Sequence, residues 1–191
     1  ALPICSATVV VTVGPVVGPI TSSSASTILC VGDTTTFGHP DAGGIWASSD
    51  DGIATWTPAG PTTVTITGIA PGTVTISYTV TDTCGTTTVT KTITVLGVPG
   101  VEPIRGSLGV CEGNITHLIG SPSGGTWVSS NPAVATVDAA GVVTAMPGTA
   151  GGSVTISYTV TNPCGAATAT ANVLVNMQPY ITTSFIVACQ T

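Results

Sequence analysis

Short runs in which valine, isoleucine and threonine alternate recur along the chain, and turns rich in glycine and proline separate them. In the first half these runs occupy residues 34–37, 44–48, 54–57, 63–67, 73–81 and 87–95. Alternation with a period of two gives a strand one buried face and one hydroxyl-bearing face. No helical periodicity accompanies it. The pattern therefore predicts an all-β fold with a sandwich of about seven short strands in each domain.

The pattern occurs twice, with a period of 80 to 81 residues. The segment that begins at Trp46 returns at Trp127, and the strand that carries Tyr78 returns with Tyr158. A repeat of this length indicates one small domain copied in tandem. We expect the four repeated aromatic residues to lie in the two cores. Trp56 is found in the first copy alone, and a core position is favoured for it over an exposed contact.

Each end of the chain resembles a single strand of the repeated domain. Residues 1–15 resemble the last strand of a repeat, and residues 178–191 resemble the opening strand of a repeat that does not follow. The predicted organisation is a tail strand at 1–15, domains at 16–97 and 98–177, and a second tail strand at 178–191. Either the tails are strands that pair with neighbouring copies, or the chain is a window cut from a longer repeat array.

The motif Trp-x-Ser-Ser, then Ala-Thr, then Val-Thr-Ile-Ser-Tyr-Thr-Val-Thr resembles the bacterial immunoglobulin-like domain repeats of the invasin and intimin type. Residues 127–137 match this pattern well, whereas the first copy departs from it at residues 51–53 and at Trp56. The resemblance implies two tandem immunoglobulin-like β-sandwiches. It also implies an adhesive or structural role in a long secreted or cell-surface protein.

The amino-acid composition excludes several classes of function. Charged residues make up 5% of the chain, Lys91 and Arg105 are the two cations, and the net charge is −6. Nucleic-acid binding needs many cations and is excluded, and no apolar run is long enough for a membrane helix. Strands with so little charge are poorly protected against edge-to-edge association. We therefore expect either self-association or a covering of sugar.

No pattern of catalytic residues stands out, so we expect no enzyme activity and no cofactor. His39 and His117 lack a partner pattern for metal binding and are interpreted as structural or surface residues. Asp33, Asp50 and Asp51 lack the spacing of a calcium loop and are interpreted as solvated turn residues. We therefore predict no metal site.

Six cysteines with almost no metal-ligand partners suggest disulfides and an oxidising, extracellular or cell-surface location. One alternative is a bridge inside each domain, Cys30–Cys84 and Cys111–Cys164. In immunoglobulin topology these positions lie at opposite ends of the domain, farther apart than a disulfide reaches. The other alternative is an interdomain Cys30–Cys164 bridge. Cross-subunit bonds then involve Cys5, Cys84, Cys111 and Cys189.

Candidate sites for sugar are a formal N-glycosylation sequon at Asn114 and threonines on outward faces and linkers: Thr21, Thr27, Thr86, Thr88 and Thr90. The leading hypothesis is an extracellular, glycosylated subunit that polymerises head-to-tail into a filament through its terminal strands. The alternative is a spacer segment of a large bacterial surface adhesin. A carbohydrate-binding module is a third hypothesis, and it requires aromatic residues exposed on one face.

Overall fold

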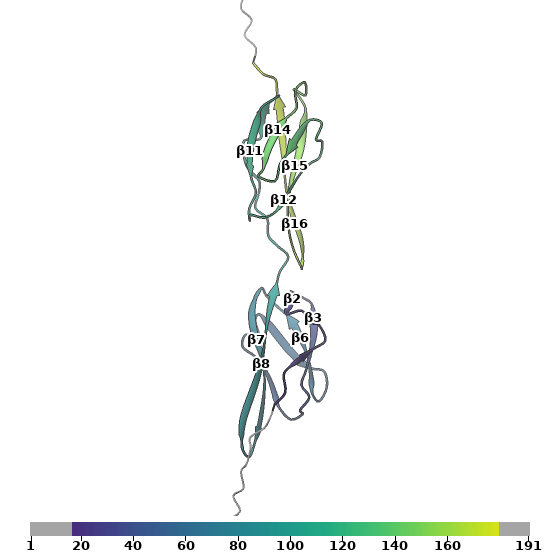
Figure 1. The fold of residues 1–191 in the computed structure, drawn as a ribbon, viewed down its shortest axis with the longest axis vertical. Coiled ribbons are helices and arrows are strands. Elements are labelled where there is room, and N and C mark those ends of the chain that lie inside the picture. The colour runs from purple at the N-terminus through teal and green to yellow at the C-terminus, as the bar shows by residue number, and fades with distance from the viewer. Residues whose placement is uncertain (1–16, 180–191) are drawn as a thin grey trace, which may run out of the picture. The chain divides into compact units, whose positions relative to one another are not determined.

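The computed structural model describes residues 17–179. The chain divides after Gly97 into two compact units, and each unit consists of two facing four-stranded sheets (Figure 1). The strands of unit 1 are β1 (Thr21–Ser22), β2 (Ile28–Cys30), β3 (Thr34–Gly38), β4 (Ile45–Ser48), β5 (Ala54–Pro58), β6 (Thr63–Gly68), β7 (Gly72–Asp82) and β8 (Gly85–Leu96). The predicted all-β sandwich is confirmed, and the expected strands lie within two residues of those observed.

Unit 2 repeats this order strand for strand. Its strands are β9 (Arg105–Gly106), β10 (Gly109–Cys111), β11 (Ile115–Ile119), β12 (Thr126–Ser129), β13 (Ala135–Val137), β14 (Val142–Ala145), β15 (Ser153–Asn162) and β16 (Gly165–Asn176). The sheet orders are β1-β3-β6-β5 and β2-β8-β7-β4 in unit 1, and β9-β11-β14-β13 and β10-β16-β15-β12 in unit 2.

The opening segment of each unit switches from one sheet to the other, which the sequence analysis did not anticipate. In unit 1, β1 pairs antiparallel with β3, whereas β2 pairs parallel with β8. Between them the hydroxyls of Ser22, Ser24 and Ser26 accept hydrogen bonds from backbone N–H groups two residues further on. These local bonds satisfy the backbone where it leaves one ladder and joins the next.

The core of each unit comes from the inward positions of the alternating runs. Phe37, Ile66 and Ile76 have no exposed surface in unit 1, and Val143, Ile156 and Val173 have none in unit 2. Threonines between these positions face outward, and several of their hydroxyls form hydrogen bonds across β7 and β8. The hydrophobic effect therefore holds the two sheets together, while hydroxyl groups rather than charged groups make the outer face polar.

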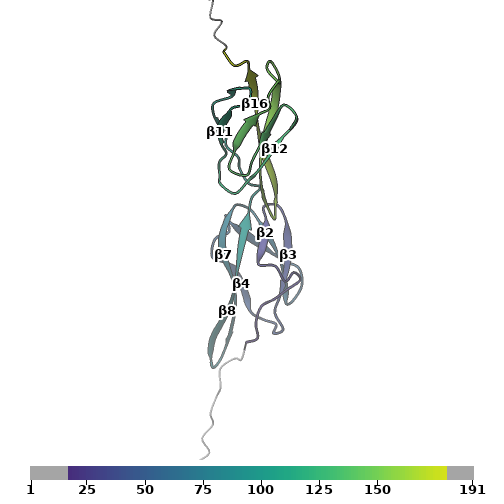
Figure 2. The same ribbon diagram turned by 45° about the horizontal axis from the view of Figure 1, so that its top comes forward.

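We call the end of a unit where the chain enters its leading end, and the end where the chain leaves its trailing end. The β7–β8 hairpin projects at the leading end of unit 1 (Figures 1 and 2). Its turn lies between Asp82 and Gly85, which pair with each other. The β15–β16 hairpin of unit 2 has the same register at Asn162 and Gly165.

Candidate functional site

The trailing end of each unit carries a cysteine at the end of its short parallel strand. Cys30 pairs with Leu96 at the end of β8, and Cys111 pairs with Asn176 at the end of β16. The carbonyl of Cys30 accepts a hydrogen bond from the N–H of Asp33, and that of Cys111 accepts one from Asn114, both at 3.0 Å. The two cysteines thus occupy duplicate positions.

The leading end of each unit carries a cysteine in the long hairpin. The Asp82 side chain accepts hydrogen bonds from the N–H groups of Cys84, at 2.7 Å, and Gly85, at 3.0 Å. In unit 2 the Asn162 side chain accepts one from Cys164 at 2.8 Å. The next residue is glycine in both hairpins, with φ of 150° at Gly85 and 144° at Gly165, a conformation that glycine adopts most readily.

Cys30 and Cys164 are disulfide-bonded, whereas Cys84 and Cys111 are free thiols. The within-domain alternative is therefore wrong. Its physical obstacle is β8, which separates Cys30 from Cys84 along its 12 residues, or roughly 36 Å at about 3.3 Å per residue. A disulfide joins Cα atoms within about 7 Å of each other. Cys5 and Cys189 lie outside the described residues, so the Cys30–Cys164 pairing and the cross-subunit bonds stay predictions.

The candidate sugar sites lie on the surface. Asn114 is exposed in the turn after β10, but the hydroxyl of Thr116 in its sequon is buried and donates to the carbonyl of Ser107. Four of the candidate threonines (Thr27, Thr86, Thr88 and Thr90) are exposed, as is Thr21, whose hydroxyl donates to the carbonyl of Gly38. Glycosylation at these positions stays a prediction.

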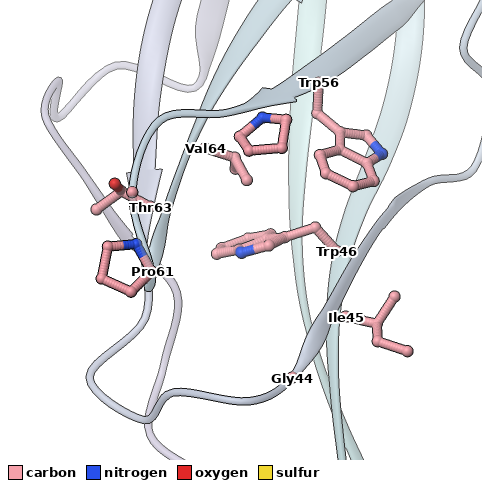
Figure 3. Close-up of a pocket in the computed structure, with 9 residues that line it drawn as sticks. Gly44, Ile45, Trp46, Trp56, Pro61, Thr63 and Val64 are labelled. Carbon is pink, nitrogen blue, oxygen red and sulfur yellow. The ribbon is translucent and has the colours of Figure 1, made fainter.

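A pocket of about 250 Å³ opens beside β4 and β5 of unit 1. The indoles of Trp46 and Trp56 line it on one side, with Pro61 and Val64 across from them, while Ile45 points away (Figure 3). Trp46 is 7% exposed and Trp56 is half-buried against the core. Trp56 has no counterpart in the second repeat, but the strand periodicity alone does not predict this pocket.

Both tryptophans act mainly as packing residues, so neither offers the exposed aromatic face that a carbohydrate-binding module requires. Val137 of β13 stands at the position of Trp56 in unit 2. There the Trp127 ring lies 4.5 Å from that of Tyr158 and is half-buried.

His39 and Asp50 form structural contacts, whereas His117, Asp33 and Asp51 are exposed. His39 is 3% exposed, its ring stacks on Tyr78 at 4.3 Å, and its Nε2 lies 2.7 Å from the carbonyl of Gly18. Asp50 accepts a hydrogen bond from the N–H of Gly52 within its own turn. Across residues 17–179 no group of three or more His, Cys, Asp or Glu side chains could hold a metal ion.

Residues 120–173 match the bacterial Ig-like domain (group 2). The resemblance to bacterial immunoglobulin-like repeats is therefore confirmed, on a segment that lies within unit 2. No curated protein matches the chain.

Solved structures similar to the chain include other tandem immunoglobulin-like proteins. Invasin, a bacterial integrin-binding protein, is 16% identical with a TM-score of 0.50, over 83% of this chain and 38% of its own. A C-terminal intimin fragment solved with its receptor domain is 18% identical, with a TM-score of 0.44 over 85% and 64% of the chains. The titin fragment I67–I69 is 17% identical, with a TM-score of 0.45 over 83% and 66%. The chain spans less than two thirds of each of these chains.

The likeness to invasin supports the immunoglobulin-like fold alone. Within the described part of the chain no helix is long and apolar enough to cross a membrane.

Proposed function

We propose that the chain is an extracellular, non-enzymatic structural protein whose immunoglobulin-like units assemble head-to-tail into a filament through terminal strands. The observation that carries this proposal is the outer edge of β16. Among residues 17–179, no strand pairs with that edge from Gly165 to Val173. The segment contains neither charge nor proline, which are the usual protections of an edge strand. Such an edge is suited to accept an added strand.

One hydrogen bond shows which backbone groups of β16 point outward from this edge. The N–H of Leu174 donates outward, away from β15, to the carbonyl of Leu108 at 2.8 Å. Because alternate residues of a strand point the same way, the N–H groups of Thr170 and Asn172 also point outward. They are available to a strand from a neighbouring copy.

The proposed donors are the tail strands at residues 1–15 and 178–191. Apart from residues 178 and 179 they lie outside the described residues, and both are rich in valine, isoleucine and threonine, which favour strands. A contact in which one end of a copy binds the other end of the next does not close on itself, so it grows into a filament.

Disulfides strengthen this proposal. We assign Cys30 and Cys164 to each other as the bond that joins units 1 and 2. Cys30 lies at the end where the chain leaves unit 1, and Cys164 lies at the end where it enters unit 2. Cys5, Cys84, Cys111 and Cys189 are then available for bonds between copies. Disulfides persist outside the cell, which supports an extracellular or cell-surface location.

The proposal includes glycosylation, because sugar would cover strands that charge does not protect. The candidate positions remain Asn114, Thr21, Thr27, Thr86, Thr88 and Thr90. The mass of reduced native material tests this part. A mass above the 18.6 kDa of the chain would support covalent sugar, and a mass equal to it would contradict glycosylation.

Sedimentation velocity and electron microscopy of the full chain test the assembly. The wild-type chain is expected to form filaments that lengthen with concentration. Thr170→Pro removes one outward N–H and is expected to weaken assembly, because proline is tolerated at a strand edge but blocks further pairing. Thr170→Ala keeps the N–H and is the matched control. A wild-type chain that stays monomeric at every concentration would contradict the filament.

A spacer role in a bacterial surface adhesin is the second candidate. The match of residues 120–173 to the bacterial Ig-like domain and the likeness to invasin favour it. In this case the units hold a ligand-binding region away from the cell and have no need to associate. A monomer in the sedimentation experiment would support this candidate over the filament.

A further inference from the structure

Among residues 17–179, each unit carries one free thiol, at its leading end in unit 1 and at its trailing end in unit 2. Cys84 is exposed in the hairpin at the leading end of unit 1, and Cys111 is half-buried at the trailing end of unit 2. Each therefore lies where a head-to-tail neighbour would begin. Within the described residues, no disulfide holds either of these cysteines.

The positions of these thiols duplicate those of the two bonded cysteines. At the trailing end, the residues after Cys30 and Cys111, Val31 and Glu112, donate hydrogen bonds to the last residue of the long strand, each at 2.9 Å. The next residues, Gly32 and Gly113, donate to the carbonyls of Gly68 at 2.9 Å and Ala145 at 3.0 Å.

The leading-end cysteines are duplicates as well. Cys84 lies in the turn of the β7–β8 hairpin, and Cys164 lies at the equivalent position of the β15–β16 hairpin. The backbone N–H of each cysteine donates a hydrogen bond to a side-chain oxygen two residues earlier. Cys84 thus presents the geometry of Cys164, and Cys111 presents that of Cys30.

We propose that Cys111 of one copy forms a disulfide with Cys84 of the next copy. This bond repeats, between copies, the bond that we assign to Cys30 and Cys164 within one copy. The inference rests on the proposed head-to-tail assembly and specifies its covalent chemistry. Each joint along the filament, within or between copies, then has one trailing-end cysteine bonded to one leading-end cysteine.

The bond forms by oxidation of two thiols. The thiolate of one cysteine attacks a low-molecular-weight disulfide and releases one small thiolate, which leaves a mixed disulfide on the protein. The thiolate of the second cysteine then attacks the protein sulfur and releases the other small thiolate. Overall, two protein thiols lose two electrons and two protons, and the small disulfide becomes two thiols.

The joint between copies differs from the joint within a copy in charge. Asp82 and Glu112 stand beside the two free thiols, whereas Asn162 and Val31 occupy the equivalent positions beside the bonded pair. Two carboxylates brought together at one joint repel each other, and salt screens that repulsion. Cross-linking between copies is therefore expected to be faster at about 1 M salt than at about 0.01 M, where the Debye lengths are about 3 Å and 30 Å.

The test combines isotope mixing with disulfide mapping. Equal amounts of ¹⁴N-labelled and ¹⁵N-labelled full chain are oxidised with uncharged 2-hydroxyethyl disulfide, so that salt acts on the protein alone. Peptides are then mapped by mass spectrometry without reduction. The expected product is a Cys84–Cys111 peptide pair, about half of which joins one light and one heavy peptide. That fraction marks a bond between copies.

Complementary variants provide the control. Cys84→Ser and Cys111→Ser chains are each expected to form no Cys84–Cys111 ladder, whereas their mixture is expected to give a single covalent dimer. The Cys5→Ser/Cys189→Ser double variant keeps both proposed partners and is expected to form the wild-type ladder. Asp82→Asn, which installs the residue of the second repeat, is expected to reduce the salt dependence.

The outcomes separate this inference from the proposed function. Filaments joined by Cys84–Cys5 or Cys111–Cys189 bonds, or filaments without any covalent ladder, would overturn the inference and leave the filament standing. Chains that neither associate nor cross-link would overturn both.

Discussion

The hydroxyl of Tyr78 accepts a hydrogen bond from the backbone N–H of Gly44 at 2.8 Å, and it donates one to the carbonyl of Asp41 at 2.7 Å. Tyr158 repeats the arrangement in unit 2, with Gly125 at 2.8 Å and Pro122 at 2.6 Å. In each unit the tyrosine thereby fixes the loop in which the chain crosses between the two sheets.

Replacing this tyrosine with phenylalanine is expected to destabilise the unit that carries it. Tyr158→Phe removes the hydroxyl and leaves a part-buried N–H and carbonyl without their partner, which costs about 1–3 kcal/mol. Denaturant unfolding measures the effect. Thr159→Ala in the same unit is the control, because it removes an exposed hydroxyl pair with Thr168 and should cost less than about 0.5 kcal/mol. Equal losses for both variants would contradict a structural role for the loop bonds.

Lys91 provides a second prediction, because its Nζ lies 5.3 Å from the ring centroid of Phe37. Unit 2 has Ala171 and Leu118 at these positions. A double-mutant cycle with Lys91→Ala and Phe37→Leu installs the residues of unit 2. The expected coupling energy is about 0.5–1 kcal/mol in favour of the native pair. Additive losses in unfolding free energy would show that the cation and the ring do not interact.

The sequence predicted most of this fold, because strand periodicity and turn residues are local signals. The runs around Trp46 and Tyr78 became β4 and β7 with ends within two residues of the expected ones. The switch between β1 and β2 could not be predicted, because the choice of partner sheet depends on long-range pairing. Periodicity likewise places a cysteine at one end of a unit, but it does not determine which two cysteines bond.

Trp56 provides a third prediction. It also shows that local sequence signals predict a strand but not the contacts between strands of different sheets. Its place on β5 was predicted, whereas the pocket that it lines together with Trp46 depends on how the two sheets face each other. Trp56→Val, the residue of unit 2, is expected to expose Trp46 and cost about 1–2 kcal/mol, less than for a fully buried tryptophan. Acrylamide quenching of tryptophan fluorescence measures the exposure. The matched variant Val137→Trp is expected to protect Trp127, and unchanged quenching in both variants would contradict this packing.

The Cys30–Cys164 bond can be tested by a single cut of the chain between these two cysteines, in the first strand of unit 2. Arg105 is the one arginine in the chain, and it is exposed in β9. An arginine-specific protease applied to the Cys84→Ser/Cys111→Ser variant should therefore cleave after this residue. Mass spectrometry under denaturing conditions, before and after reduction, then reports whether a disulfide joins the two sides.

A Cys30–Cys164 bond predicts that the cut chain keeps its full mass plus one water until it is reduced. Reduction then separates residues 1–105 from residues 106–191. Separation of these fragments without reduction would show that Cys30 and Cys164 bond within their own fragments, and it would contradict the joint on which the account depends.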